Sequence, residues 1–325
     1  MKLHRRKLIG AAGAAIALPA LSRLAFAQAY PSRPARIIVG YAAGGGTDIT
    51  ARLIAQWLSD RLGQQFVVEN RPGAATNIAT EAVARSAPDG YTLMLTTAAN
   101  SINASYYDKL NFDFVKDMAP VGAIMRVPLV LVVNPSLPVK TVRELVDQCK
   151  ANPRKLNFGS GGAGGPDHMA GEYFKLATGV DILHVAYRGL SPALTDLIGG
   201  QIQMVFSTTS AAIQYIKSDK LRALAVTSAS RSDALPEVPV MGDVLGGYEA
   251  SQWYGLGAPK NTPADIIATL NKEILAAQAD PKLKTRLAEL GGVPMTMTAA
   301  EFGKFLADDT EKWAKVVKFS GAKVN

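Results

Sequence analysis

Two glycine-rich segments, each running into an acidic residue, are the parts of this sequence best suited to binding an anion. They are residues 43–48 and residues 157–168. Each follows a short apolar stretch and precedes a run with helical periodicity, which predicts a turn between a strand and a helix. Glycine lets the backbone approach a ligand closely, and the first turn of a helix leaves N–H groups unpaired. Two such turns in different halves of the chain predict the two walls of an anion-binding cleft.

Polar side chains just beyond the predicted strand ends are further candidates, because open α/β sheets bind ligands at the carboxyl ends of their strands. Arg188 either pairs with a ligand carboxylate or is a solvated charge. His168 either lines the cleft or caps the helix that it begins. Asp48 and Asp167 are predicted to cap their helices, since a carboxylate at a helix start accepts its unpaired N–H groups. The predicted ligand-binding residues are Tyr41, Ala43, Gly44, Gly45, Thr47, Asp48, Thr97, Asn100, Ser160, Gly161, Gly164, His168, Arg188 and Ser207.

The second glycine segment also admits an enzymatic interpretation. Residues 159–164 match the GxGxxG pattern, so an exported nucleotide-cofactor oxidoreductase is an alternative function. That pattern requires an acidic residue at the end of the next strand, where Arg188 stands instead. No lysine follows the glycines as in a phosphate-binding loop, and Phe158 occupies the first glycine position of a GxSxG elbow. Only two histidines follow residue 29, without a metal-binding pattern, so we predict a protein that is not an enzyme and has no metal and no cofactor.

Residues 1–29 have the features of an export signal. A basic start with Arg5 and Arg6 precedes an apolar run over 8–21 and an Ala-x-Ala pattern that ends at Ala27 or Ala29. The apolar run is too short to span a bilayer. The paired arginines resemble a twin-arginine signal, and general secretory export remains an alternative.

Removal of that signal changes what the charge of the chain implies. It takes five of the 35 basic residues and leaves 30 against 27 acidic residues, a net charge of +3. So small an excess gives no reason to expect binding to nucleic acid or to a membrane surface. Cys149 is the only cysteine, which excludes an intrachain disulfide, and it is predicted to be a buried thiol on a helix.

Alternating strands and helices predict an α/β protein with two mixed or parallel sheets flanked by helices. One βα series covers residues 36–96 and a second covers 142–227, and the last third is helical. Residues 121–133 form a β-rich run that we expect to be a crossover and not a central strand, because Pro128 lacks an N–H group. The chain is thus predicted to form one lobe from 30–125 plus 253–325 and another from 126–252. Two chain crossings would allow closure around a ligand.

Sequence blocks spread over nearly the whole chain after residue 29 form a recognisable set. They are Ala43-Gly44-Gly45-Gly46-Thr47-Asp48, Val68-Glu69-Asn70-Arg71-Pro72-Gly73-Ala74, Pro88-Asp89-Gly90-Tyr91-Thr92-Leu93, Tyr187-Arg188-Gly189, Lys220-Leu221-Arg222-Ala223-Leu224-Ala225-Val226-Thr227 and Trp253-Tyr254-Gly255-Leu256. This set closely resembles the Bug family, the periplasmic solute receptors of tripartite tricarboxylate transporters. One departure is Ala75-Thr76, where many relatives have further glycines.

The resemblance implies a bilobal periplasmic-binding fold of type II, the Venus-flytrap arrangement. It implies a receptor that holds a small organic acid or amino-acid-like carboxylate through backbone groups of the two glycine turns, here 43–48 and 160–168. Membrane subunits of the transporter are the expected partners, the periplasm the expected location, and a monomer the expected state. A receptor that presents its ligand to a membrane sensor kinase is a second alternative.

Overall fold

The computed structural model describes residues 30–187 and 189–321. The predicted export signal, with its cleavage near Ala27 or Ala29, and Arg188 lie outside the described residues. The first part of the chain forms β1 (Ala35–Val39), α1 (Gly46–Leu62), β2 (Phe66–Asn70), η1 (Ala74–Thr76), α2 (Asn77–Ala84), β3 (Thr92–Thr97), α3 (Ala98–Tyr106) and α4 (Phe114–Asp117). The middle part forms β4 (Met118–Val133), α5 (Val142–Ala151), β5 (Asn157–Ser160), α6 (Pro166–Thr178), β6 (Leu183–Ala186), α7 (Leu190–Ile198), β7 (Met204–Thr208), α8 (Thr209–Lys217), β8 (Arg222–Val226) and α9 (Met241–Val244). The last part forms β9 (Ser251–Pro259), α10 (Ala264–Ala279), α11 (Pro281–Glu289), β10 (Val293–Pro294) and α12 (Ala299–Ser320).

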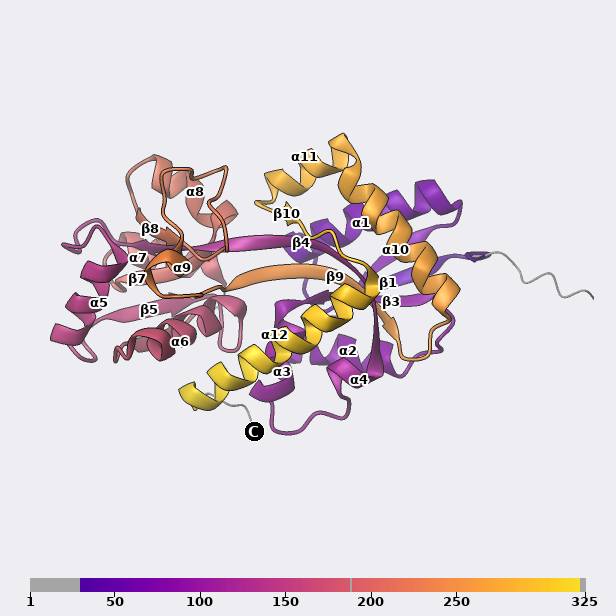
Figure 1. Cartoon of the computed structure of the whole chain (residues 1–325), viewed down its shortest axis with the longest axis horizontal. Coiled ribbons are helices and arrows are strands. Elements are labelled where there is room, and N and C mark those ends of the chain that lie inside the picture. The colour runs from indigo at the N-terminus through magenta and orange to yellow at the C-terminus, as the bar shows by residue number, and fades with distance from the viewer. Residues whose placement is uncertain (1–29, 188, 322–325) are drawn as a thin grey trace, which may run out of the picture.

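The strands form two mixed sheets that share β4, as the alternation of apolar strands and amphipathic helices predicts. The hydrogen-bonded path runs β2-β1-β3-β9-β4-β7-β5-β6, with β8 and β10 also pairing with β4. Pairing is parallel within β2-β1-β3 and within β7-β5-β6, and antiparallel wherever β9 or β4 takes part. In Figure 1, β4 and β9 run lengthwise through the molecule, with α5–α9 at one end and α1, α10 and α11 at the other.

The prediction for Pro128 is wrong, because β4 lies between β9 and β7 in the middle of the path. The reason is a change of partner along the strand. Up to Pro128, which lies opposite Ser251, β4 pairs with β9; from Leu129 onward it pairs with β7. The missing N–H group therefore falls where one ladder ends and the next begins. A central strand tolerates proline at such a point.

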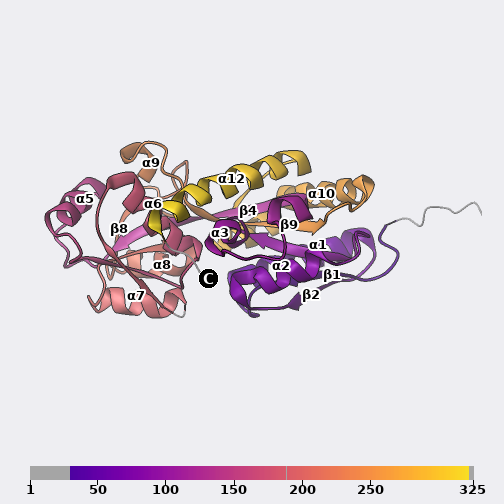
Figure 2. The ribbon, with the colours of Figure 1, turned by 90° about the horizontal axis from the view of Figure 1, so that it is seen from below.

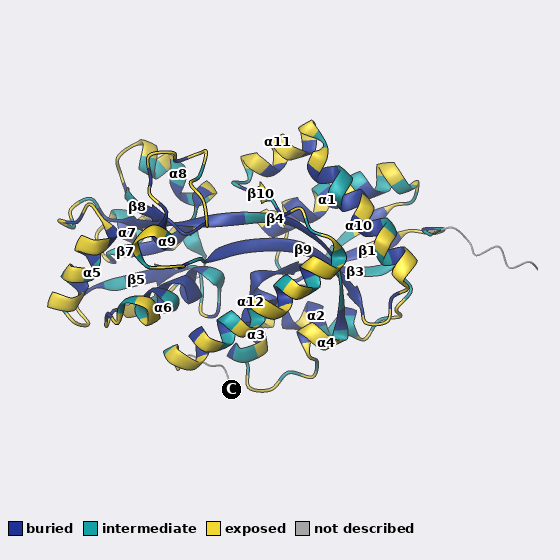
Figure 3. Cartoon of the chain, in the orientation of Figure 1, coloured by how far each residue is buried: buried dark blue, intermediate teal, exposed yellow. Residues whose placement is uncertain are grey.

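The C-terminal helix α12 packs against elements of both sheets. Phe302 and Leu306 belong to an apolar cluster with residues of β1 and β3, and Trp313 belongs to another with residues of β5 and α6. Between these two groups, the indole of Trp253 donates to Asp309 at 2.9 Å. In Figure 2 the helix extends from one end group to the other, and Figure 3 shows its inner face buried and its outer face exposed.

Among residues 30–187 and 189–321, no helix is both long and apolar enough to cross a bilayer. The same residues contain no group of three or more acidic, histidine or cysteine side chains placed to hold a metal ion. Cys149 is fully buried on α5, and burial raises the pKa of its thiol to about 11. The boundaries of the two predicted lobes stay a prediction.

Candidate functional site

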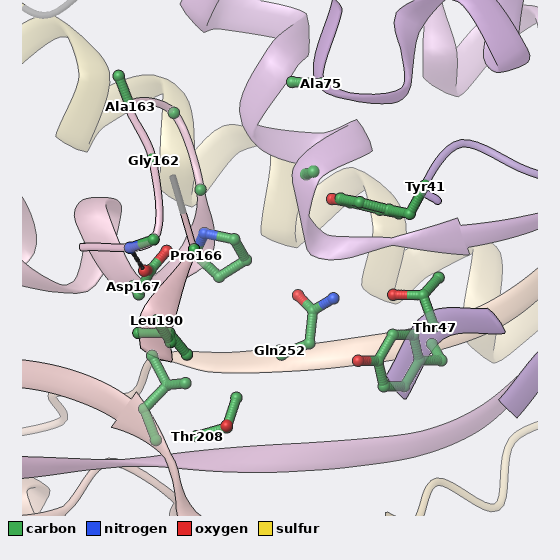
Figure 4. A pocket seen from close by; sticks show the side chains of 17 residues that line it. Tyr41, Thr47, Ala75, Gly162, Ala163, Pro166, Asp167, Leu190, Thr208 and Gln252 are labelled. Carbon is green, nitrogen blue, oxygen red and sulfur yellow. Dashed lines mark hydrogen bonds between the residues drawn. The ribbon is translucent and has the colours of Figure 1, made fainter. Parts of the chain in front are cut away.

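One cleft of about 420 Å³ is lined by residues of both glycine turns. Figure 4 shows Tyr41, Thr47 and Ala75 on one side and the turn with Gly162 and Ala163 on the other, with Gln252 between them. The lining residues are Tyr41, Thr47, Ala75, Ala99, Leu129, Gly161, Gly162, Ala163, Gly164, Gly165, Pro166, Asp167, Gly189, Leu190, Thr208, Gln252 and Tyr254. Of the residues predicted to bind ligand, Tyr41, Thr47, Gly161 and Gly164 are in this set.

The N-terminus of α1 opens into the cleft through Thr47. No hydrogen bond within residues 30–187 and 189–321 uses the N–H group of Gly46 or Thr47 as its donor. Unpaired N–H groups and the helix dipole together place partial positive charge at this end of the helix. The first wall can therefore donate to an anion without any positively charged side chain.

Asp48 in the first turn of α1 stabilises the preceding glycine turn and does not cap its own helix, contrary to the prediction. Its Oδ2 accepts the N–H of Gly44 at 2.9 Å and Nε of Arg52 at 3.0 Å, and its Oδ1 accepts Nδ2 of Asn70 at 3.0 Å. Burial opposes ionisation of this carboxyl, but these hydrogen bonds outweigh it and lower the pKa. Because Arg52 balances the carboxylate, the N-terminus of α1 keeps its positive character.

The second wall is a turn whose N–H groups are mostly paired within the turn itself. The carboxylate of Asp167 accepts the N–H of Gly161, and burial raises the pKa of that carboxyl. Gly162 and Gly165 also donate inside the turn. Within the described part of the chain, the N–H of Ala163 has no acceptor. The second turn thus offers fewer free donors than its glycine content predicts.

Glycine is required at position 164 for two separate reasons. Gly164 has φ of +79°, a backbone conformation that residues with a side chain rarely adopt. A Cβ added there would lie 2.7 Å from Cε1 of Tyr106, which packs behind the turn. Its N–H donates to Nδ1 of His168 at 3.0 Å. The path of the turn along the cleft therefore depends on a residue that does not line the cleft.

His168 lies behind the second turn, where it stacks on His184 with ring centroids 3.8 Å apart. Nε2 of His184 is 2.7 Å from Oγ of Ser160, and Nε2 of His168 is 3.7 Å from the buried Glu172. Burial is the main cause that lowers the pKa of His168 to about 3 and that of His184 to about 4, with the positive charge of Lys175 adding to both. Both rings are consequently neutral at physiological pH, and Nδ1 of His168 is free to accept the Gly164 N–H.

The other predicted residues lie away from the cleft wall. Thr97 and Asn100 are buried at the start of α3, where they form a capping box, and Ser207 is buried on β7. Ser160 is fully buried, and Ala43, Gly44 and Gly45 are exposed on the first turn. Arg188 lies outside the described residues, although its neighbour Gly189 lines the cleft. The part these residues play in ligand binding stays a prediction.

A strained turn that the sequence analysis did not place at the site contributes Ala75. Ala74, Ala75 and Thr76 have φ of 45°, 48° and 83°, although none is glycine. The turn is held by Asn103, whose amide donates to the carbonyl of Ala75, and by Asn100, whose amide donates to Oγ1 of Thr76 at 3.1 Å. Ala75-Thr76 is also the departure from the resembled family that the sequence shows, and this departure is the signal by which the turn could have been found.

Gln252 and Tyr254 on β9 were also missed as site residues. Side chains two residues apart on a strand point to the same face, and both of these residues line the cleft. Burial raises the pKa of Tyr254, and burial likewise raises the pKa of Tyr41 to about 12. Both hydroxyls therefore stay neutral near pH 7. The sequence signal for Tyr254 was the block Trp253-Tyr254-Gly255-Leu256. Neighbouring side chains on a strand point to opposite faces of the sheet, so Tyr254 lies on the face opposite to that of the buried Trp253.

These features together define a class of protein. Two α/β sheets share long strands, and a cleft lined by a strand-to-helix turn from each sheet has a size suited to a small molecule. This is the architecture of a solute-binding receptor of the periplasmic-binding type.

Comparisons with known proteins identify the family. A model described as "Tripartite tricarboxylate transporter family receptor" matches residues 50–322, and the chain belongs to that family. Protein BugT of Bordetella pertussis is 37% identical over 327 residues, covering 99% of this chain and 100% of BugT. The solved structure of R. palustris Rpa4515 with adipate is 35% identical with a TM-score of 0.78, covering 90% of this chain and 98% of that one. MatC from Rhodopseudomonas palustris with bound malate is 28% identical with a TM-score of 0.75, covering 89% of this chain and all of that one. The family is one of periplasmic receptors and not of enzymes.

Proposed function

We propose that this protein captures a small mono- or dicarboxylate in the cleft between its two glycine turns and delivers it to the membrane subunits of a tripartite tricarboxylate-type transporter. The observation that carries the proposal is the meeting of both turns in one cleft of about 420 Å³. Membership of a receptor family, with relatives solved with adipate and malate, supports a carboxylate as the ligand.

The carboxylate is proposed to bind at the N-terminus of α1. The proposed donors there are the free N–H groups of Gly46 and Thr47 and the hydroxyl of Thr47, and the second turn adds the N–H of Ala163, which has no acceptor among the described residues. Hydrogen bonds to an ionised acceptor are about twice as strong as neutral ones. None of the lining side chains within the described residues is a lysine or an arginine, so dipoles and neutral donors recognise the charge.

Ligand capture is proposed to involve movement of the predicted lobes, 30–125 plus 253–325 against 126–252. Pro128 and Ser251 face each other where β4 changes partner, which makes this point of the strand pair the proposed hinge. Hinge closure around a ligand commonly uses a few residues at the ends of elements. The receptor is proposed to act as a monomer.

A binding screen on the mature protein, residues 30–325, tests the function. Calorimetry and thermal unfolding are measured with C3 to C8 mono- and dicarboxylates, amino acids and the uncharged amide of each acid. A ligand at about 100 times its Kd stabilises the native state by about 2.7 kcal/mol, which corresponds to an increase in Tm of about 4 °C for a chain of this length. The amides should not bind, because they lack the charge that the helix N-terminus recognises.

A matched pair of variants locates the binding. Thr47→Val removes a hydroxyl from the cleft and should weaken carboxylate binding about tenfold, the value of one lost charge-assisted hydrogen bond. Thr195→Val makes the same change on the exposed side of α7 and should bind as the wild type does. Well-folded protein that binds no acid in the panel would contradict the proposal. Deleting the gene and measuring solute uptake separately from gene induction distinguishes transport from sensing.

A further inference from the structure

Gln252 carries an unpaired acceptor atom in the cleft. The residue is 8% exposed, and its Oε1 has no hydrogen-bond partner among the described residues. In Figure 4 the amide stands between the two walls, with its oxygen directed toward the wall that contains Pro166 and its nitrogen away from it. A buried acceptor without a partner is costly, and such atoms are rare in folded proteins.

The position of this amide is fixed from both sides. The backbone of Gln252 pairs with Val127 on β4, one pair before the end of the β4–β9 ladder at Pro128 and Ser251. The amide lies beside Tyr254, whose pKa it influences, and its nitrogen is directed away from the second wall. Tyr254 interacts in turn with Thr47. The unpaired oxygen is therefore the end of the amide that faces the second wall, and it is the end left for a ligand.

A second acceptor faces the same space. Asp167, a residue that is 8% exposed, lines the cleft, and its carboxyl accepts the N–H of Gly161. Bulk water does not reach Oε1 of Gln252 in this conformation, but the last torsion of a glutamine side chain is broad. A small rotation brings the oxygen against a group seated in the cleft. Both acceptors then favour a ligand that donates a hydrogen bond.

We propose that Gln252 makes this receptor select carboxylates that carry a hydroxyl or amino group over the same acids without one. The inference rests on the proposed function and specifies its ligand class. An unsubstituted acid leaves the Gln252 oxygen buried and unpaired, whereas a donor-bearing acid satisfies it. Sites built to bond a hydroxyl discriminate strongly against analogues that lack it. The relatives solved with ligands include both kinds, since malate has a hydroxyl and adipate has none.

Calorimetric titration of matched acids tests the inference. The pairs are butyrate with 3-hydroxybutyrate, succinate with malate, and adipate with 3-hydroxyadipate; aspartate and oxaloacetate are added as amino and keto partners of malate. In at least one pair the donor-bearing acid should bind about tenfold or more tightly than its unsubstituted partner. Oxaloacetate should not share the advantage of malate, because a keto group is an acceptor.

Variants assign the preference to the amide oxygen. Gln252→Leu should bring the two members of the preferred pair to within about twofold of each other. Gln252→Glu retains an acceptor, so it should keep the preference while weakening both acids by charge repulsion. Gln56→Leu makes the first substitution on the exposed face of α1 and should behave as the wild type does.

The outcomes separate this inference from the function on which it rests. If the wild-type protein binds acids but treats the members of every pair alike, or prefers the unsubstituted or keto acid, the inference is wrong and the receptor function stands. If no acid in any pair binds to folded protein, both fail. The wild-type comparison needs no variant, so a variant that does not fold leaves the test intact.

Discussion

Lowering the pH from 8 to 5 should remove about 4 kcal/mol that the stacked pair His168 and His184 contributes to the free energy of unfolding. The chain has three histidines, and the third, His4, precedes residue 30. Within residues 30–325 these two rings are thus the only side chains whose ordinary pKa lies between pH 5 and 8.

The magnitude follows from the lowered pKa values. In the unfolded chain a histidine titrates near 6.5, whereas in the folded protein His168 titrates at about 3 and His184 at about 4. Above pH 6.5 both states hold neutral rings, so the full stability is present. Between pH 6.5 and 5 the unfolded state alone takes up the protons. Stability therefore falls as the pH drops, by about 1.4 kcal/mol per pH unit and per ring, or about 2 kcal/mol for each ring at pH 5.

Urea unfolding of residues 30–325, followed by tryptophan fluorescence at both pH values, measures the effect. His168→Asn replaces the accepting Nδ1 by an amide oxygen that can still receive the Gly164 N–H, and His184→Gln retains a polar atom near Ser160. Each variant should lose about 2 kcal/mol less than the wild type over this pH range. Gln201→His adds an exposed histidine as a control and should leave the pH dependence unchanged.

The comparison between variants cancels the contribution of other groups. Burial raises the pKa of Asp167, so that carboxyl gains protons earlier in the folded state and adds stability as the pH falls. This opposite contribution is present in the wild type and in the histidine variants alike. A double variant that loses as much stability as the wild type between pH 8 and 5 would refute the assignment to the two rings.

Three further results are expected, each measured by urea unfolding or by thiol labelling. Gly164→Ala should lower the free energy of unfolding by about 2–4 kcal/mol, because it combines backbone strain with a clash against the ring of Tyr106 behind the turn. The control Gly44→Ala should lower it by only about 1 kcal/mol, because Gly44 also has a positive φ, of +88°, but an added Cβ would have no atom within 4 Å. Asp309→Ala should cost about 1–3 kcal/mol by leaving the buried indole N–H of Trp253 unpaired, and Asp309→Asn, which keeps an acceptor, should cost less. Cys149, buried and with its pKa raised to about 11, should react with a thiol reagent about 10³-fold or more slowly in native than in denatured protein; fast labelling in buffer would show that α5 opens locally.

The local pattern of the sequence predicted the sheet architecture and the meeting of the two glycine turns. Both predictions rest on short-range signals, namely apolar strands, helix periodicity and turn residues, which act before distant parts of the chain meet. The resemblance to a receptor family used many such blocks at once. This is why the family and the fold followed from the sequence alone.

What the sequence did not predict depends on contacts between distant segments. Pro128 is tolerated in a central strand because β4 changes partners there, which no local pattern reveals. His168 lies behind its turn because His184, 16 residues further on, provides the stacking surface. The positive φ of Ala75 is maintained by an asparagine on another helix. Such positions follow from tertiary packing overriding local preference.

The position of β9 between β3 and β4 constrains how this chain can be completed during synthesis. Residue 97 ends β3, yet its antiparallel neighbour begins at residue 251, more than 150 residues later. At 5–20 residues per second a ribosome needs roughly 8–30 s to make the intervening segment. Throughout that interval the edge of β3 is open to pairing with any other extended strand. We therefore expect a newly made chain to keep that edge protected, by a chaperone or by delayed folding, until its final third has emerged.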